Sequence, residues 1–99
     1  MQGNYVRIVG SVKRNAEAES VREGLRALNF TVEAPTDSDR PTYVDCIAYG
    51  DVVESIEGFV EAGEPIEVEG FLMFRTYTDG RGRKKSSLYV MAESITTEE

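Results

Sequence analysis

The sequence predicts a small all-β domain with a single helix, on three observations. Most of the chain shows apolar and polar side chains in alternation, a period of two that is typical of half-buried strands. The alternation changes to helical spacing only once, shortly after residue 50. The 99 residues, 40% of them hydrophobic, suit one folded domain, because a second core would have too few residues to bury. We therefore expect one domain over residues 1–99, with a folded core from about residue 4 to residue 95.

Five segments carry the strand-like alternation. They are residues 5–12, 25–34, 43–49, 66–76 and 87–95. Because successive side chains of a strand point to opposite faces, the apolar members of each segment predict its buried side. In the third segment, this rule places Cys46 inside the fold with Val44 and Ala48 as a small core residue.

The remaining connections follow from the same pattern. In the fourth segment, Leu72 and Phe74 fall on the apolar face. Residues 15–23 are polar and predict a connection between the first two strands. Residues 78–82 predict the turn between the last two strands, because the Asp79-Gly80 pair within them tolerates the positive φ of tight turns. The fourth and fifth segments should therefore form a hairpin.

One apolar stripe has the spacing of a helix of about three turns. Its members are Val52, Val53, Ile56, Phe59 and Val60. Asp51 is expected to cap the start of this helix, and Gly63 is expected to follow its end. Five strands with one helix between the third and the fourth is the order of an OB-fold, a five-stranded Greek-key barrel. The pattern by itself also fits a split sandwich.

The residue inventory excludes several kinds of site. The chain has no His, which removes the most frequent general base and the most frequent metal ligand, so we expect no catalytic residues, no metal and no cofactor. Cys46 is the sole cysteine, which rules out an internal disulfide and suits a reducing compartment such as the cytoplasm. No apolar run approaches the roughly 20 residues that span a bilayer, so a membrane partner is not expected.

The charge of the chain is unevenly distributed. The net charge of −7, taken alone, argues against a nucleic-acid partner, because phosphates favour a basic surface. Residues 51–74 hold seven acids and no base, whereas residues 75–85 hold five bases and one acid. The acidity therefore belongs mainly to the helix and the strand after it, and the predicted hairpin is basic.

The chain resembles the bacterial-type single-stranded DNA-binding protein (SSB) family over nearly its whole length. Residues 4–12 resemble the opening strand of that family, and residues 27–32 resemble its second strand. The most specific stretch is residues 43–50, the helix, and then residues 62–72, which is similar to the family's run from the aromatic strand through the helix to the fourth strand. Residues 75–82 and 90–95 are similar to its last hairpin.

The resemblance implies an OB-fold that binds single-stranded DNA without sequence preference in replication or repair, without catalysis. It places Tyr43, Tyr49 and Tyr77 at positions where the family stacks DNA bases, a contact that any base can make. The basic residues expected to contact phosphates are Arg75, Arg81, Arg83, Lys84 and Lys85. It also implies a homo-oligomer, a dimer or tetramer, in the cytoplasm with the nucleoid or in the plastid stroma. We expect a short member of the family without the C-terminal tail that recruits repair proteins.

A second hypothesis is a protein-interaction or assembly module with weak or no DNA binding, similar to the small primosomal replication protein of the same fold. It rests on the net charge of −7, on the absence of Trp, and on Asp45, which occupies a position where the family often has a basic residue. A carboxylate between two stacking tyrosines repels passing phosphates. The sequence therefore predicts weak, salt-sensitive binding confined to one side of the molecule.

Overall fold

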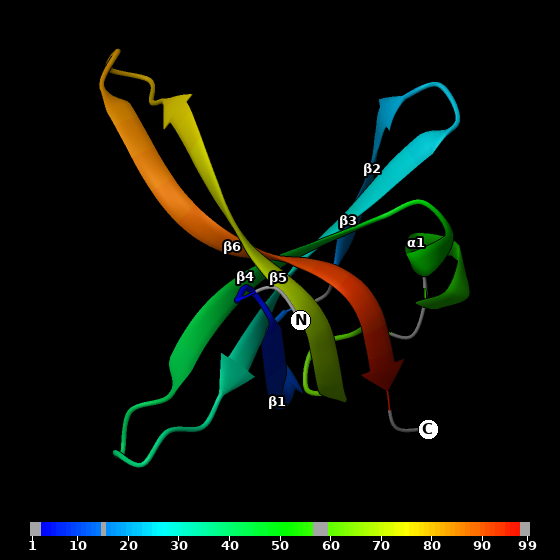
Figure 1. The fold of residues 1–99 in the computed structure, drawn as a ribbon, viewed down its shortest axis with the longest axis vertical. Coiled ribbons are helices and arrows are strands. Elements are labelled where there is room, and N and C mark those ends of the chain that lie inside the picture. The colour runs from blue at the N-terminus through cyan, green and yellow to red at the C-terminus, as the bar shows by residue number, and fades with distance from the viewer. Residues whose placement is uncertain (1–2, 15, 57–59, 98–99) are drawn as a thin grey trace.

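Six strands and one short helix form the described part of the chain (Figure 1). A computed structural model describes residues 3–14, 16–56 and 60–97. The elements are β1 (Val6–Val12), β2 (Glu17–Arg22), β3 (Leu25–Ala34), β4 (Thr42–Tyr49), α1 (Asp51–Ile56), β5 (Pro65–Thr78) and β6 (Lys84–Thr97). The prediction of an all-β fold with one helix is confirmed. No helix in these three ranges is long and apolar enough to cross a membrane.

Five of the strands close into a ring. The hydrogen-bonded order is β1-β5-β6-β4-β3-β2, and a further pairing between β1 and β3 joins the two sides of the sheet. That pairing is short and antiparallel, and it matches Ser11 with Glu33 and Val12 with Val32. β4 and β6 run parallel, and the other pairs are antiparallel. The closed ring confirms the five-stranded Greek-key barrel of OB type and excludes a split sandwich.

The prediction that residues 15–23 are only a connection is wrong, because β2 lies within them. Its register matches Glu17 with Asn29 and Ala18 with Leu28, so it pairs with β3 beyond the barrel. All six residues of β2 are exposed, so no apolar face marks them as a strand. Backbone pairing with β3 holds the segment in place.

The core lies between the inner faces of the barrel strands and the helix. Cys46 and Ala48 are buried there, with Val44 packed against the same cluster, as the alternation predicts. Val53 and Ile56 of α1 join them. The capping residue of the helix is Gly50 and not the expected Asp51. The Gly50 carbonyl oxygen accepts hydrogen bonds from the backbone N–H groups of Val53 (3.0 Å) and Glu54 (3.4 Å), which are the first of the helix. Phe59, in the predicted stripe, lies outside the described residues.

The β5–β6 hairpin is longer than the sequence predicts and extends away from the barrel, at the upper left of Figure 1. Its pairing continues to Thr78 and Lys84, so β6 begins three residues before the predicted start. Among the described residues, no second sheet covers the inner face of the hairpin beyond the barrel. The prediction that Leu72 and Phe74 are buried is therefore wrong: Phe74 is 64% exposed, and Leu88 beside it is 59% exposed.

The hairpin turn is built around the carboxylate of Asp79. Its Oδ1 accepts hydrogen bonds from the backbone N–H groups of Arg81 (2.9 Å) and Arg83 (3.0 Å). The positive φ of this turn falls on Gly82 rather than on the expected Gly80. The side-chain cap of Asp79 stabilises a turn over residues 79–83, which is close to the predicted residues 78–82.

Two glycines allow neighbouring strands to approach closely. A Cβ at Gly10 would overlap the carbonyl oxygen of Glu33, at the β1–β3 closure. A Cβ at Gly70 would overlap the carbonyl oxygen of Met91, beside the irregularity in the β5–β6 register. Both neighbours are backbone atoms, so a side chain at either position requires the strands to separate.

We predict that Gly70→Ala lowers the free energy of unfolding by about 1–3 kcal/mol, because the added methyl group displaces the backbone of β6. Urea denaturation followed by circular dichroism measures the change. The matched control is Gly80→Ala, where the added carbon has open space around it and the effect should stay within about 0.5 kcal/mol. Equal stability of the two variants would contradict the close approach.

Burial also predicts the behaviour of the thiol. Desolvation raises the pKa of Cys46 to about 12, and the neighbouring Asp45 carboxylate adds to the rise. At pH 8 we expect Ellman's reagent to label the native protein only as fast as the chain unfolds, and to label it at once in guanidinium. Because folding raises this pKa, the thiol stabilises the fold below about pH 9, and that contribution is lost as the pH rises toward 12. Rapid labelling of the native protein would refute the burial.

Candidate nucleic-acid interface

The outward-facing residues of β4, β6 and the distal part of β5 form one continuous sheet face. Ile47 pairs with Met91, which pairs with Phe71, so these three side chains share a face. By the period-two rule this face also carries the three predicted tyrosines and the carboxylate of Asp45, because Cys46 and Ala48 point into the core. We call this surface the outer face.

The three tyrosines are distributed over the outer face on two different strands. Tyr43 and Tyr49 are at the two ends of β4, about 20 Å apart at the usual rise of a strand. Tyr77 lies near the end of the β5–β6 hairpin, where it pairs with Lys85. Tyr43 and Tyr77 are each 51% exposed, so about half of each side chain is accessible to a ligand.

Tyr49 is more buried than the other two because it packs on a second, smaller apolar cluster. Ala27, Ile47 and Tyr89 form the buried part of that cluster, and Met73 lies against it. This cluster lies on the outer face of the sheet and packs against the Tyr49 ring. Tyr49 therefore offers less of its ring than Tyr43 or Tyr77 does.

Two cations lie against aromatic rings on this face. The Lys13 ammonium is 3.7 Å from the centroid of the Tyr43 ring. The Arg75 guanidinium is 5.1 Å from the centroid of Tyr89, and its Nε donates a hydrogen bond to Ser87 at 3.1 Å. Lys13 and Tyr89 are not among the site residues that the sequence predicts. Alternation along residues 87–95 does place Tyr89 on the face of Arg75, whereas no pattern in the sequence points to Lys13.

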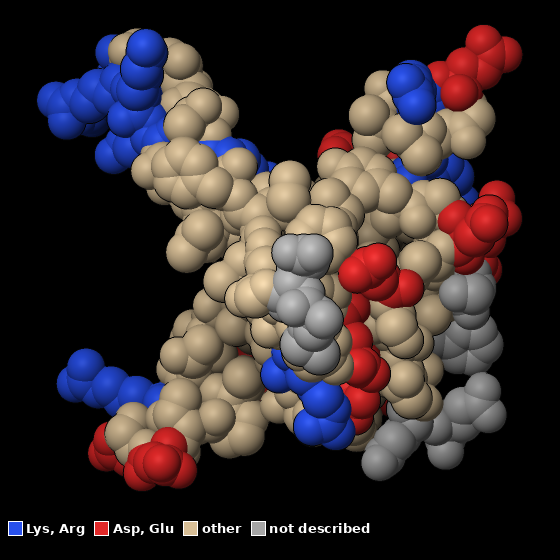
Figure 2. Space-filling view, in the orientation of Figure 1, with Lys and Arg blue, Asp and Glu red and all other residues tan. Residues whose placement is uncertain are grey.

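The predicted basic residues of the hairpin are brought together and exposed. Lys and Arg side chains gather at the hairpin end in Figure 2 (upper left), and Asp and Glu occupy the side near α1 and parts of the two other hairpin ends. The register divides the lysines between the two faces of β6. Lys85 pairs with Tyr77 and shares the outer face, whereas Lys84 pairs with Thr78 and points the other way.

Two glutamates of β5 make hydrogen bonds with residues of β1 and of the segment just before it. Arg7 and Glu67 form a salt bridge at 2.9 Å, and this hydrogen bond raises the pKa of the Arg7 guanidinium. The Tyr5 hydroxyl donates to the Glu69 carboxylate, which raises the pKa of Tyr5. These contacts join β1 to β5 on the side away from the basic hairpin end.

A hollow of about 330 Å³ opens on the outer face between the strands. The polar residues lining it are Arg14, Glu17, Asn29, Thr31, Asp45 and Arg75. The Thr31 hydroxyl donates to Oδ1 of Asp45 at 3.0 Å, and the Asn29 amide donates to Glu19 at 3.2 Å. Asp45 thus lies on the face of Tyr43 and Tyr49, as the alternation predicts, and it borders a cavity that also holds two arginines.

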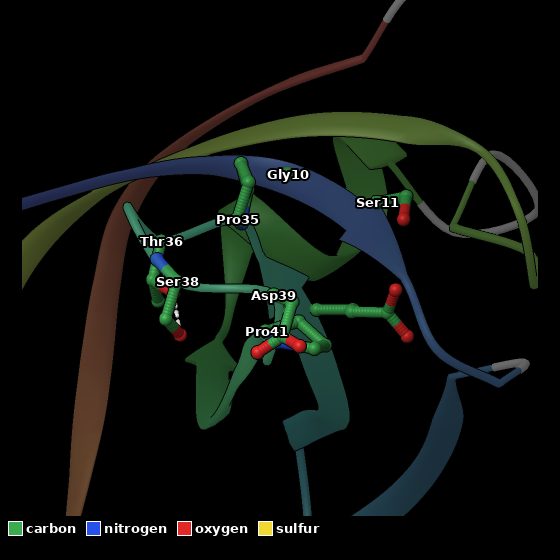
Figure 3. Close-up of a pocket in the computed structure, with 8 residues that line it drawn as sticks. Gly10, Ser11, Pro35, Thr36, Ser38, Asp39 and Pro41 are labelled. Atoms are coloured by element: carbon green, nitrogen blue, oxygen red, sulfur yellow. Dashed lines mark hydrogen bonds between the residues drawn. The ribbon is translucent and has the colours of Figure 1, made fainter.

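A second hollow, of about 400 Å³, lies between β1 and the connection from β3 to β4 (Figure 3). Hydroxyls and carboxylates line it, and the loop closes on itself through Thr36, Ser38 and the Arg40 carbonyl. Its lining includes no aromatic ring and no cation, so it does not suit a nucleic acid. In the described ranges, no cluster of three or more acidic or cysteine side chains could hold a metal ion.

The chain is similar to known proteins over nearly its whole length. The model of the single-strand binding protein family matches residues 3–97. The proteins named single-stranded DNA-binding protein from Halalkalibacterium halodurans and Wolinella succinogenes are 26% and 29% identical to this chain. The protein of the same name from Borreliella burgdorferi is 23% identical.

Each of these alignments covers 93% of the chain, and the chain spans 58%, 62% and 67% of the relatives from H. halodurans, W. succinogenes and B. burgdorferi. The family match extends over all six described strands and the helix. This chain therefore belongs to the single-strand binding protein family.

Proposed function

We propose that this chain binds single-stranded DNA along its outer face, without catalysis, in DNA replication or repair. The observation that carries the proposal is the half-exposed pair Tyr43 and Tyr77 on one sheet face that ends in a basic hairpin. Bases stack on such rings whatever their sequence, at roughly 1–3 kcal/mol per base. The relatives named single-stranded DNA-binding protein support the same ligand.

In this proposal, the DNA strand crosses the outer face, where its bases contact the tyrosines and its phosphates contact the basic hairpin. Tyr43 and Tyr77 supply half-exposed rings, with the Lys13 ammonium over one face of Tyr43, and Tyr49 supplies a more buried ring. Arg75, Arg81, Arg83, Lys84 and Lys85 supply the positive charge. Lys85 is best placed for a strand that stacks on Tyr77, because the two residues are cross-strand partners on the same face.

The assembly and location in this proposal come from the family resemblance. We propose a homo-oligomer, a dimer or a tetramer, which acts in the cytoplasm at the nucleoid or in the plastid stroma. An oligomer would place several outer faces along one strand of DNA and raise the effective affinity of each.

A second candidate function is that of a protein-interaction module with little affinity for DNA. The exposed apolar side chains Leu72, Phe74 and Leu88 on the inner face of the hairpin favour it, together with Asp45 on the outer face. The two functions predict opposite results for a simple titration with DNA.

We predict that fluorescence-labelled oligo-thymidine binds at low salt and is released as salt rises. For single strands the slope of log K against log[salt] is about −0.7 per neutralised phosphate. The double variant Arg81→Ala/Arg83→Ala should make the slope shallower by about 1.4, and Arg40→Ala, on the β3–β4 connection, should leave it unchanged. Absence of binding at low salt with micromolar protein would refute DNA binding and favour the interaction module.

We predict that Tyr43→Ala and Tyr77→Ala each weaken oligo-thymidine binding by roughly 5- to 150-fold, because each removes one stacking ring. The control is Tyr77→Phe, which keeps the ring and should keep most of the affinity. Anisotropy titrations at fixed salt give the ratio. If both alanine variants bind as tightly as the parent protein, the stacking assignment is wrong.

A further inference from the structure

The carboxylate of Asp45 is held by a hydrogen bond, which repulsion of DNA phosphates alone does not require. Thr31 donates to its Oδ1 at 3.0 Å, which fixes the carboxylate toward the hollow on the outer face. Oδ2 has no hydrogen-bond partner among the described residues, and no cation lies within ion-pair distance there. One oxygen is therefore held in place, and the other is free to accept from a ligand.

The same hollow also contains hydrogen-bond donors. Arg14 and Arg75 line it together with Asp45, and the Arg75 guanidinium is held by the Tyr89 ring and by Ser87. Its volume, about 330 Å³, is at the lower end of the range for small-ligand sites. A carboxylate held by Thr31 and a guanidinium held by Tyr89 and Ser87 thus line one hollow of that size.

These groups match one nucleobase better than the others. Guanine presents two adjacent donors, N1–H and N2–H, to a carboxylate, and it presents two acceptors, O6 and N7, to an arginine. Adenine and cytosine place a ring-nitrogen acceptor beside their amino group, so that lone pair faces the carboxylate. Thymine has a single N–H between two carbonyl oxygens, which a carboxylate repels.

We propose that the hollow around Asp45 reads guanine, so that this chain prefers guanine-containing single strands to oligo-thymidine. The inference rests on the proposed binding of single-stranded DNA. Asp45 accepts from the Watson–Crick edge of the base, and Arg75 or Arg14 donates to O6 and N7. Repulsion between Asp45 and the phosphates acts on every sequence alike, whereas the hydrogen bonds form only with guanine.

The test compares labelled oligonucleotides of equal length by fluorescence anisotropy at one salt concentration. One is all thymidine, and the others carry three separated guanines, hypoxanthines or adenines in the same positions. Hypoxanthine keeps N1–H and lacks the 2-amino group. Adenine stacks as a purine without offering the two adjacent donors. We expect guanine to strengthen binding by about 5- to 150-fold over thymidine, hypoxanthine to be intermediate, and adenine to be near thymidine.

The variant Asp45→Asn should remove the guanine preference and leave oligo-thymidine binding equal or tighter, because one repulsive charge is lost. Asp37→Asn, on the exposed β3–β4 connection, removes the same charge away from the hollow and should keep the preference. Binding of oligo-thymidine without any preference for guanine, or a preference that survives Asp45→Asn, would overturn this inference and leave the proposed function intact. Failure to bind any of the oligonucleotides would instead overturn the proposed function.

Discussion

The short contact between β1 and β3 is the constraint on which the rest of the structure depends. Two residue pairs, Ser11 with Glu33 and Val12 with Val32, close the sheet into a ring. Gly10 makes the contact possible, because any side chain there would overlap the Glu33 carbonyl. Once the ring is closed, the inner faces of five strands meet in one core, and the opposite faces are left for a ligand.

Closure also determines what extends beyond the barrel. β5 and β6 are 14 residues each, longer than the barrel wall they belong to, so their distal halves continue as a free hairpin. On the outer face the small cluster of Ala27, Ile47 and Tyr89 supports the base of that hairpin. The opposite face has no such support, which leaves Phe74 exposed. The two faces of the hairpin therefore differ in chemistry although they share the same strands.

The alternation of side chains predicted the faces of most strands, since the side chains inside a barrel must be apolar. It placed Cys46 in the core and Asp45 outside it correctly for that reason. It failed for β2, because both faces of that strand are exposed and show no apolar alternation. Backbone pairing with β3 and a hydrogen bond from Asn29 to Glu19 hold β2 in place. It failed again at Phe74, because alternation tells which face a side chain is on and not whether a second layer covers that face. The partners of the site residues, such as Thr31 for Asp45, depend on register and could not be predicted.

The length of the free hairpin also bears on how an acidic protein meets an acidic polymer. From Leu72 to Thr78 the strand extends about 20 Å at the usual rise per residue. At physiological ionic strength, mobile ions attenuate the field of a charge over about 8 Å. The cationic end is thus separated by more than two screening lengths from the glutamates of the barrel. Their repulsion of a polyanion is therefore largely screened at the hairpin end, where the attraction of the basic residues dominates. A chain with a net charge of −7 can in this way present a local field of the opposite sign.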